Sequence, residues 1–324
     1  MKTKYLILGS GIGGLAAGAR LKEIGEHNFA IIDKCDSLPL NLHNGVHYLH
    51  SNDFGTPFPF ELKKIQATEE IWDPRTDNFR KISHIPEMLE YSMKIMGLRH
   101  PSSIMDPGNR NWDTYLPMSN NMNDLLSGYY NYIGSHFLWG RRLRRIDAEK
   151  KEVYVGLGDN EVPEVVEYEH LISTIPLPTL YKSCYFVSEN EFKNAPVHIT
   201  NYKTDKIVGN WLIGIYISDP KFPPHRLTIL NNIISMESIK PMTYEDEVIV
   251  KYHLERYFDY SLKTKESYTW DTGRIWGLTK EEREKVVNSF RKNNIHLVGR
   301  FARWDGKLLM DSTILQAKSV IDSI

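Results

Sequence analysis

The sequence predicts an α/β protein whose first domain is a Rossmann-like, dinucleotide-binding sheet. Three observations lead to this prediction. A glycine-rich turn separates an apolar run from a helical run, an acidic residue closes a second apolar run, and a last buried strand precedes a C-terminal amphipathic helix. Further apolar runs of strand length lie between these segments, so we expect a second, mixed sheet with helices to form the substrate region.

The glycine-rich turn is written LILGSGIGGLAAG and contains Gly9, Gly11 and Gly14. In such a turn the first glycine permits a tight bend, the second lets the backbone approach a pyrophosphate, and the third lets helix and strand pack closely. The helix that follows offers free N–H groups to phosphate oxygens. The segment therefore predicts a nucleotide cofactor bound through its phosphates.

The second apolar run, Phe29 to Ile32, is predicted to form the next strand and ends at Asp33. Asp33 follows the glycine turn at close to the ~20 residues expected of a carboxylate that binds a ribose hydroxyl. Asp33 and the adjacent Lys34 are therefore predicted to bind the cofactor.

The next part of the chain predicts a long loop and then a partly helical insertion. Asn, Pro, His and aromatic residues dominate the stretch after Asp33, which is typical of an extended loop. Residues 61–110 predict mixed helix and loop, with a helix from Pro86 to Leu98. A second, amphipathic helix is expected to start near Asn121 to Asn123.

The segments HFLWG, RRID, KEVYVGL and EVVEYEHLISTIP predict a small antiparallel meander that returns to the main sheet. Farther on, WLIGIYI and RLTILNNII predict strands of the second sheet within residues 197–255. A capping box, Thr279 with Glu282, predicts a helix that ends near Arg291. It is followed by a buried strand, IHLVGR, and by a helix from Asp311 or Ser312.

We therefore expect two domains assembled from alternating segments. The cofactor-binding domain comprises residues 1–60, 115–185 and 290–324. The substrate-binding domain comprises residues 61–114 and 186–289.

Composition limits the classes of partner. The 324 residues include 40 basic and 41 acidic side chains, so no overall field attracts nucleic acid or an anionic membrane. RRLRR, from Arg141 to Arg145 with Lys150 and Lys151 following, is the one dense basic segment and leaves a local DNA contact open.

The two cysteines, Cys35 and Cys184, cannot make a disulfide framework or a four-ligand zinc site. The 12 histidines lack metal-binding spacing, so no metal is expected. The sequence has no signal-peptide pattern and no apolar run long enough to span a membrane, and we expect a cytoplasmic protein without a membrane partner. It does not indicate the oligomeric state.

Five dispersed segments carry a family resemblance. They are GSGIGGLAAGARL with Asp33, NGVHYLHS with His47, YLPMSNNMNDLL, LISTIPLPTL with Thr174, and LVGRFARWDGKLLMD. Together they resemble the flavoprotein superfamily that includes amine oxidases, protoporphyrinogen oxidase and UDP-galactopyranose mutase. The resemblance implies that the cofactor is FAD, that Thr174 lies beneath it, and that His47 lies beside the isoalloxazine ring.

The last of these segments resembles a closing motif in which a Gly-Arg pair and a later Asp bind the flavin diphosphate and ribityl chain. Here those residues are Gly299, Arg300 and Asp311. Glycine permits close backbone approach, arginine neutralises phosphate, and the helix that begins near Asp311 directs N–H groups toward the flavin.

One loop departs from the family pattern. Relatives carry an Arg-any-Gly-Gly loop after the second strand, whereas this chain has CDSLPLNLHNG with one glycine. We therefore expect the loop to take a different path over the diphosphate. A catalytically silent FAD-binding protein remains an alternative.

Three residues are catalytic candidates. His47 is expected to orient the flavin or exchange a proton with substrate, or else to be a buried histidine bonded to backbone. Trp304 is expected to form an aromatic wall for an amine or a flat substrate, with core packing as the alternative. Arg226 is expected to bind a substrate carboxylate, or else to pair with an acidic neighbour.

We interpret the chain as an FAD-dependent oxidoreductase that oxidises a C–N bond of an amine or amino-acid-like substrate by hydride transfer to flavin N5. Two enzymatic alternatives stay open. One is a flavin-dependent lyase or oxidase that removes an amino-acid group from a hypermodified DNA base, as implied for phage members of this superfamily. The other is a non-redox enzyme similar to UDP-galactopyranose mutase.

Overall fold

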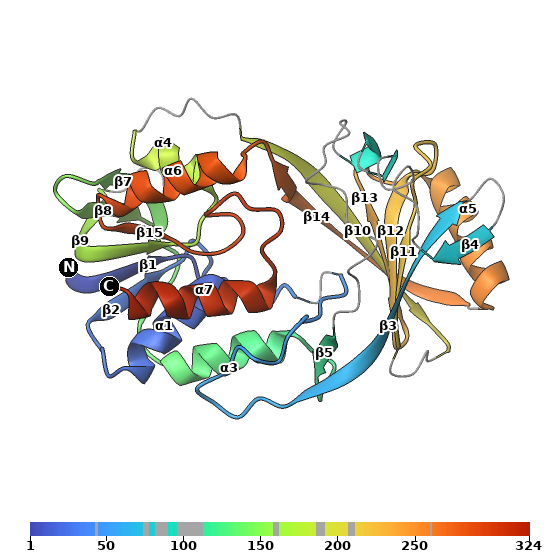
Figure 1. Ribbon diagram of the computed structural model, residues 1–324, viewed down its shortest axis with the longest axis horizontal. Helices are drawn as coiled ribbons and strands as arrows, with labels where there is room; N and C mark the ends of the chain where they lie inside the picture. The colour runs from blue at the N-terminus through green and yellow to red at the C-terminus, as the bar shows by residue number, and fades with distance from the viewer. Residues whose placement is uncertain are drawn as a thin grey trace.

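Two sheets, each with its own helices, lie side by side along the long axis of the molecule (Figure 1). The computed structural model describes residues 1–42, 45–73, 78–81, 90–91, 93–95, 113–157, 162–185, 192–206, 211–259 and 261–324. Both chain ends lie in the body that contains the first sheet.

The first sheet contains the strands that the N-terminal pattern predicts. Its order is β6-β2-β1-β9-β8-β7, and β15 pairs with β9. β1 is parallel to β2 and β9, whereas β7 pairs antiparallel with β8 and β8 with β9, so the predicted meander and its return to the main sheet are confirmed for these three strands. HFLWG, expected in the same meander, instead forms β6, which is parallel to β2 at the opposite edge. The strands are β1 (Lys2–Leu8), β2 (Phe29–Ile32), β6 (Phe137–Leu138), β7 (Arg142–Asp147), β8 (Glu152–Gly156), β9 (Glu164–Ser173) and β15 (Ile295–Leu297).

Helices cover both faces of this sheet, because alternate side chains of its central strand enter two different cores. Ile7 of β1 packs with α1, α3 and α7, whereas Leu6 and Leu8 pack with α4 and α6. The helices are α1 (Ile12–Glu23), α3 (Asn123–Ile133), α4 (Leu177–Ser183), α6 (Lys280–Arg291) and α7 (Met310–Asp322).

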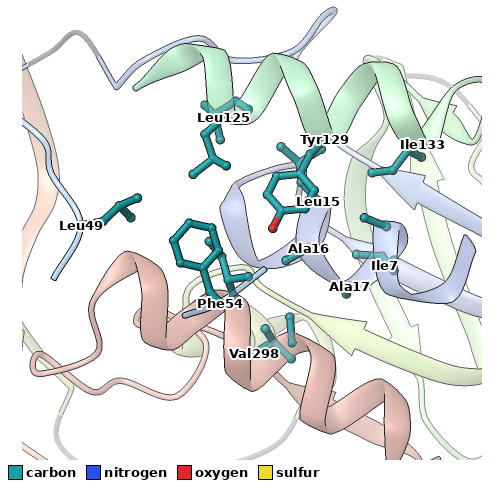
Figure 2. Packing of buried hydrophobic residues seen from close by; sticks show 14 of the residues in the cluster. Ile7, Leu15, Ala16, Ala17, Leu49, Phe54, Leu125, Tyr129, Ile133 and Val298 are labelled. Atoms are coloured by element: carbon teal, nitrogen blue, oxygen red, sulfur yellow. The ribbon is translucent and has the colours of Figure 1, made fainter. Parts of the chain in front are cut away.

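The first helix is buried between two others. On one side, α1 packs against α3, where Tyr129 lies near Leu15, Ala16 and Ala17 (Figure 2). On its other side lie α7 and Val298, which belongs to the loop that precedes α7. Small side chains on α1 allow this close approach on several sides. The helix that follows the glycine turn is therefore held firmly in place.

The second sheet has the order β14-β10-β13-β12-β11-β3-β4, with β5 paired to β3. β11 is parallel to β3, and the other pairs are antiparallel. One helix, α5 (Tyr244–Phe258), packs Val250 and Leu254 on this sheet. The strands are β3 (Leu62–Asp73), β4 (Asn78–Lys81), β5 (Thr114–Pro117), β10 (Lys193–Thr204), β11 (Trp211–Tyr216), β12 (Pro224–Leu230), β13 (Ile233–Ser238) and β14 (Leu262–Trp276).

Two elements correct the expectations from sequence. Residues 61–110 were expected to mix helix and loop, but β3 is a 12-residue strand. Its sequence LKKIQATEEIWD carries charges on much of its length, which hides the alternation of apolar and polar positions. Of the helix expected from Pro86 to Leu98, residues 90–91 and 93–95 are helical and the others lie outside the described residues.

The second correction is α5, which lies where only strands were expected. Its capping box was the available signal: the Thr243 hydroxyl accepts from the N–H of Asp246, and the Asp246 carboxylate accepts from the N–H of Thr243. The expected domain boundary at 290 also falls too late. α6 packs Val286 and Phe290 into the core of the first sheet, so the return to that body begins with this helix.

Removing the cap of α6 tests its contribution to the first body. Thr279 Oγ1 accepts from the N–H of Glu282 at 3.2 Å, and Glu282 Oε2 accepts from the N–H of Thr279 at 2.7 Å. We expect Thr279→Ala to lower the free energy of unfolding by about 1 kcal/mol, measured by urea denaturation. Lys280→Ala, at the exposed next position, is the control. An unchanged midpoint in Thr279→Ala would contradict the capping role.

Candidate functional site

The glycine turn lies at the C-terminal end of β1 and has room for a ligand. Gly9 has φ +98°, and a Cβ there would collide with the Thr174 hydroxyl. A Cβ on Gly14 would collide with the carbonyl oxygen of Gly9. A Cβ on Gly11, by contrast, would meet no atom within 4 Å. Gly9 and Gly14 are thus needed by the fold itself, while the space at Gly11 fits the approach of a phosphate.

The Asp33 carboxylate, predicted to bind the ribose, is held in place beside the glycine turn. Asp33 Oδ2 accepts from the N–H and the hydroxyl of Ser10, both at 2.7 Å, and Oδ1 accepts from the N–H of Cys35 at 2.9 Å. A carboxylate accepts about four hydrogen bonds, which leaves capacity for a ribose hydroxyl. Lys34 is exposed beside it. Thr174 donates its hydroxyl to the Leu8 carbonyl at 2.7 Å and thereby supports the turn from β9.

The C-terminal motif comes from the same body. Gly299 has φ +89°, and its N–H donates to Gln316 Oε1 at 2.7 Å. Arg300 Nε is buried without a hydrogen-bond partner among the described residues. Burial, with repulsion from Arg274 and Arg226, lowers the pKa of Arg300 to about 10, which still leaves it charged at neutral pH. A buried guanidinium with a free N–H fits an anion such as the flavin diphosphate.

Residues 45–50 form a loop that connects the two bodies. The N–H of His50 donates to Asp311 Oδ2, at the start of α7, at 3.2 Å. At the other end of the loop the His47 ring stacks on Trp270 of β14, with centroids 5.5 Å apart. Burial lowers the pKa of His50, although Asp311 and Glu69 oppose this shift. The loop therefore places two imidazoles between the C-terminal motif and the second sheet.

A group of charged side chains on the second sheet faces this junction. Glu237 of β13 is its centre and contacts Arg226 Nη2 of β12, Arg274 Nη2 of β14 at 2.9 Å and His225 Nε2 at 3.5 Å. The pairing of β12 with β13 is irregular between Pro224 and Arg226, and this lets consecutive residues reach the same carboxylate. We call these four residues, Glu237, Arg226, Arg274 and His225, the arginine cluster.

The arginine cluster has net positive charge. Burial alone would raise the pKa of the Glu237 carboxyl, but Arg226, His225 and Arg274 outweigh it and hold that pKa well below its ordinary value. Complete burial lowers the pKa of His225 to about 4, so its ring is neutral at neutral pH. Two guanidiniums against one carboxylate leave one positive charge. The Nε atoms of both arginines are buried without partners among the described residues, so the cluster can accept an anion.

The three catalytic candidates, His47, Arg226 and Trp304, have different environments in the structure. His47 lies at the junction. Arg226 does pair with an acidic neighbour, as the alternative interpretation expected, yet it retains a free Nε. The aromatic wall expected of Trp304 is corrected: the side chain is 2% exposed, its Nε1 donates to the Trp276 carbonyl at 2.7 Å, and its ring packs on Phe192. Trp304 is therefore a core residue.

Sequence reasoning missed Glu237, Arg274 and His225. Glu237 stands alone in the otherwise uncharged run ILNNIISMES, and a single acid in such a strand was a signal for a buried ion pair. Arg274 gave no such signal, because the strand that carries it, β14, was not predicted.

Two of the four arginines in the basic segment RRLRR pair with neighbouring acids. Arg141 pairs with Glu164 at 3.1 Å, and Arg145 pairs with Asp147 at 3.4 Å while its guanidinium lies over the Tyr154 ring. Within the described ranges, no group of three His, Cys, Asp or Glu is arranged to hold a metal ion. In that same part of the chain, no helix combines the length and hydrophobicity needed to cross a membrane.

Solved structures share this fold over the whole chain. Reduced UDP-galactopyranose mutase aligns with 99% of this chain and 93% of its own, at 16% identity and a TM-score of 0.70. A fatty acid isomerase from P. acnes aligns over 99% and 98% at 10% identity and 0.63, and putrescine oxidase bound to putrescine over 100% and 99% at 10% identity and 0.60. No protein-family model and no curated protein sequence matches the chain. The chain thus shares the fold of these three proteins, as its resemblance to the superfamily of UDP-galactopyranose mutase and the amine oxidases implied.

Two glycine substitutions separate the fold from cofactor binding. We expect Gly14→Ala to lower stability by about 1–3 kcal/mol, because the added methyl collides with the Gly9 carbonyl. We expect Gly11→Ala to keep the melting temperature of the cofactor-free protein but to weaken FAD binding about tenfold or more, because the methyl fills the open space. Thermal melting and FAD titration measure the two effects. The opposite pattern would contradict the assignment.

Burial of His225 predicts a specific pH dependence of stability. The unfolded chain takes up this proton near pH 6.5 and the folded chain only near pH 4, so the unfolded state binds more protons between these values. Stability should therefore fall as the pH falls from 6.5 to 4, by up to about 1.4 kcal/mol per pH unit from this residue. His225→Gln should flatten that slope in denaturant melts. An unaltered slope in His225→Gln would count against a neutral His225.

Proposed function

We propose that this protein is an FAD-dependent oxidoreductase that oxidises the C–N bond of a small substrate with a carboxylate, an amino acid or a close analogue. The observation that carries the proposal is the arginine cluster, whose net positive charge and free Nε atoms face the junction where the flavin-binding residues and the second sheet meet. The shared fold with a mutase, an isomerase and an oxidase supports a flavoenzyme and leaves the reaction open.

The residues of the first body fit FAD. The turn with Gly11 and the carboxylate of Asp33 would hold the adenosine diphosphate half, and Gly299, Arg300 and the start of α7 would hold the half with the ring. When bound, FAD supplies the acceptor for the two electrons that leave the substrate C–H bond as a hydride. The protein supplies binding and placement.

The arginine cluster selects the substrate by charge. Arg226 and Arg274 can each offer Nε and a terminal nitrogen to a carboxylate, which is the geometry in which guanidinium binds most specifically. One added carboxylate neutralises the single excess charge. Glu237 keeps both guanidiniums in position before substrate arrives. His47, which stacks on Trp270 of β14, would orient the ring or exchange a proton with the substrate amine.

A second candidate is a non-redox, mutase-like reaction on a nucleotide sugar. Arg300 is the observation in its favour, because it lies near enough to Arg226 and Arg274 for mutual repulsion to lower its pKa. If Arg300 serves substrate rather than FAD, three guanidiniums face one carboxylate and match a diphosphate.

Spectroscopy of the purified protein tests the primary proposal. We expect a yellow protein or one that takes up added FAD, and anaerobic bleaching by one member of a panel of amino acids and amines. Failure to bind FAD would overturn the whole assignment. Bleaching only by dithionite, followed by isomerisation of a nucleotide sugar, would favour the mutase-like reaction over the oxidase.

Substitution of the two arginines tests the carboxylate site. We expect Arg226→Gln and Arg274→Gln each to weaken binding of a carboxylate ligand about 10- to 100-fold, since a charged hydrogen bond contributes about 1.5–3 kcal/mol. The change in the flavin spectrum during titration with a non-reactive carboxylate measures this binding without turnover. Arg20→Gln is the matched control, because Arg20 pairs with Glu23 and Asp322 in the last turn of α1, at the opposite end of that helix from the glycine turn. Unchanged affinity in both cluster variants would contradict the site.

A further inference from the structure

A cleft with a volume of about 410 Å³ opens at one edge of the first sheet, where β15 lies between α6 and α7 (Figure 1). β15 pairs with β9 on one side, and no described strand pairs with its other side. Residues of α6, β15 and α7 line the cleft, together with Arg303 from the loop before α7. None of the residues assigned above to the cofactor lines it. Its volume is typical of a site for a small molecule.

The free edge of β15 turns backbone groups toward the cleft. The N–H of Val298, just after β15, donates to the Ser173 carbonyl of β9 at 3.0 Å. Hydrogen-bonding groups of successive residues in a strand point to opposite sides, so Ile295 and Leu297 direct theirs away from β9. Both residues line the cleft. The N–H groups of this edge are therefore available to a ligand.

Side chains around this edge add further hydrogen-bond donors. Gln316 Oε1 accepts from the N–H of Gly299 at 2.7 Å, so its amide NH2 group is the part that remains for a ligand. Ser319 of α7 and Asn288 of α6 also line the cleft, and each can donate. Donors thus reach the same space from three elements.

Two guanidiniums give the cleft its charge. Neither Arg291 nor Arg303 forms a hydrogen bond or an ion pair through its side chain with any described residue. Burial lowers the pKa of the Arg303 guanidinium, which stays charged at neutral pH, and an anion beside it would offset this cost. Burial also lowers the pKa of His296 to about 4, so its ring adds no charge.

The acidic groups near these arginines have cationic partners of their own. Glu284 is the one carboxylate in the described lining, and its Oε1 lies 4.0 Å from Lys280 Nζ. Asp305 lies near Arg303, but its Oδ2 is 3.7 Å from Arg283 Nε. Two guanidiniums against one carboxylate in the lining leave a net positive charge.

We propose that this cleft binds a small organic phosphate, independently of the reaction at the junction. A phosphate monoester has three oxygens that point in different directions, and here donors come from β15, from α7 and from the arginines. A carboxylate has two oxygens in one plane and would leave part of this donor set unused. Val287 and Val320 line the same cleft and provide apolar contacts for the organic part of the ligand.

Hydrogen exchange measured by mass spectrometry tests the site locally, with inorganic phosphate as the probe. We expect phosphate to slow exchange of the backbone N–H groups at residues 295–297 of the full chain, because they become donors to its oxygens. Phosphate bound at the glycine turn or in the arginine cluster would be detected in other peptides. Acetate at the same ionic strength should protect residues 295–297 less. No protection by phosphate, or equal protection by acetate, would overturn the proposal.

Arg291→Gln and Arg303→Gln test the role of the charge. Each should raise the phosphate concentration for half-maximal protection about tenfold or more, since each removes a charge-assisted contact. Arg256→Gln, which removes one positive charge from α5 in the second body, is the matched control and should not alter it. Exchange without phosphate shows whether each variant keeps the wild-type fold, and exposed Arg291 preserves the test if Arg303→Gln disturbs its loop. An unchanged half-maximal concentration in both cleft variants would also overturn the proposal.

Discussion

The close approach of α1 to β1 at Gly14 is the constraint on which the rest of the structure depends. A side chain at this position would collide with the carbonyl of Gly9, so the helix can leave the sheet edge at this angle only with glycine there. That angle buries α1 against both neighbours. A Cβ on Gly13, one residue earlier, would lie 3.2 Å from Val298 and from Thr313, in the segments that carry the C-terminal motif. The two ends of the chain are thus brought together by the contact that shapes the turn.

The junction between the bodies carries a cost that the fold alone does not explain. Three arginines there keep Nε atoms buried without partners among the described residues, and each unsatisfied donor costs about 1–3 kcal/mol. The hydrophobic cores on either side are well packed without these arginines. The buried, unpaired Nε–H groups therefore lower stability and are not explained by the needs of folding. An anionic ligand that accepts from them recovers the lost hydrogen bonds. The destabilised part of the molecule is therefore the part expected to bind.

The sequence predicts the first body well because its signals are local. The glycine turn, the capping box of α6 and the short apolar strands each contain their own evidence within a few residues. The second body was predicted less well. β3 carries charges along a strand that bridges the two bodies, and the capping box at Thr243 lies among apolar runs that favoured strands.

The candidate site divides in the same way. Gly11, Asp33, Gly299 and Arg300 follow from spacing and resemblance. Glu237 and Arg274 meet only because β10 lies between β13 and β14 in the sheet, and the order of strands that are far apart in sequence is not written in any short segment. Trp304 is the opposite case. Because it lies inside a recognised motif, it was predicted to contact substrate, but its ring is part of a hydrophobic core.

In the proposed carboxylate site, Glu237 has a defined role even though it partly neutralises the site's charge. Without it, Arg226 and Arg274 would repel each other and turn toward solvent, and a ligand would have to order both side chains as it bound. With it, the guanidiniums are held in fixed positions, and because each keeps a free Nε, a carboxylate can bind beside Glu237 without displacing it. The cluster therefore attracts an anion less strongly than two unpaired arginines would, but it holds both guanidiniums in position before the anion binds. Such a site favours a single carboxylate in one orientation over a larger and more highly charged anion, and orientation is what hydride transfer to a fixed ring requires.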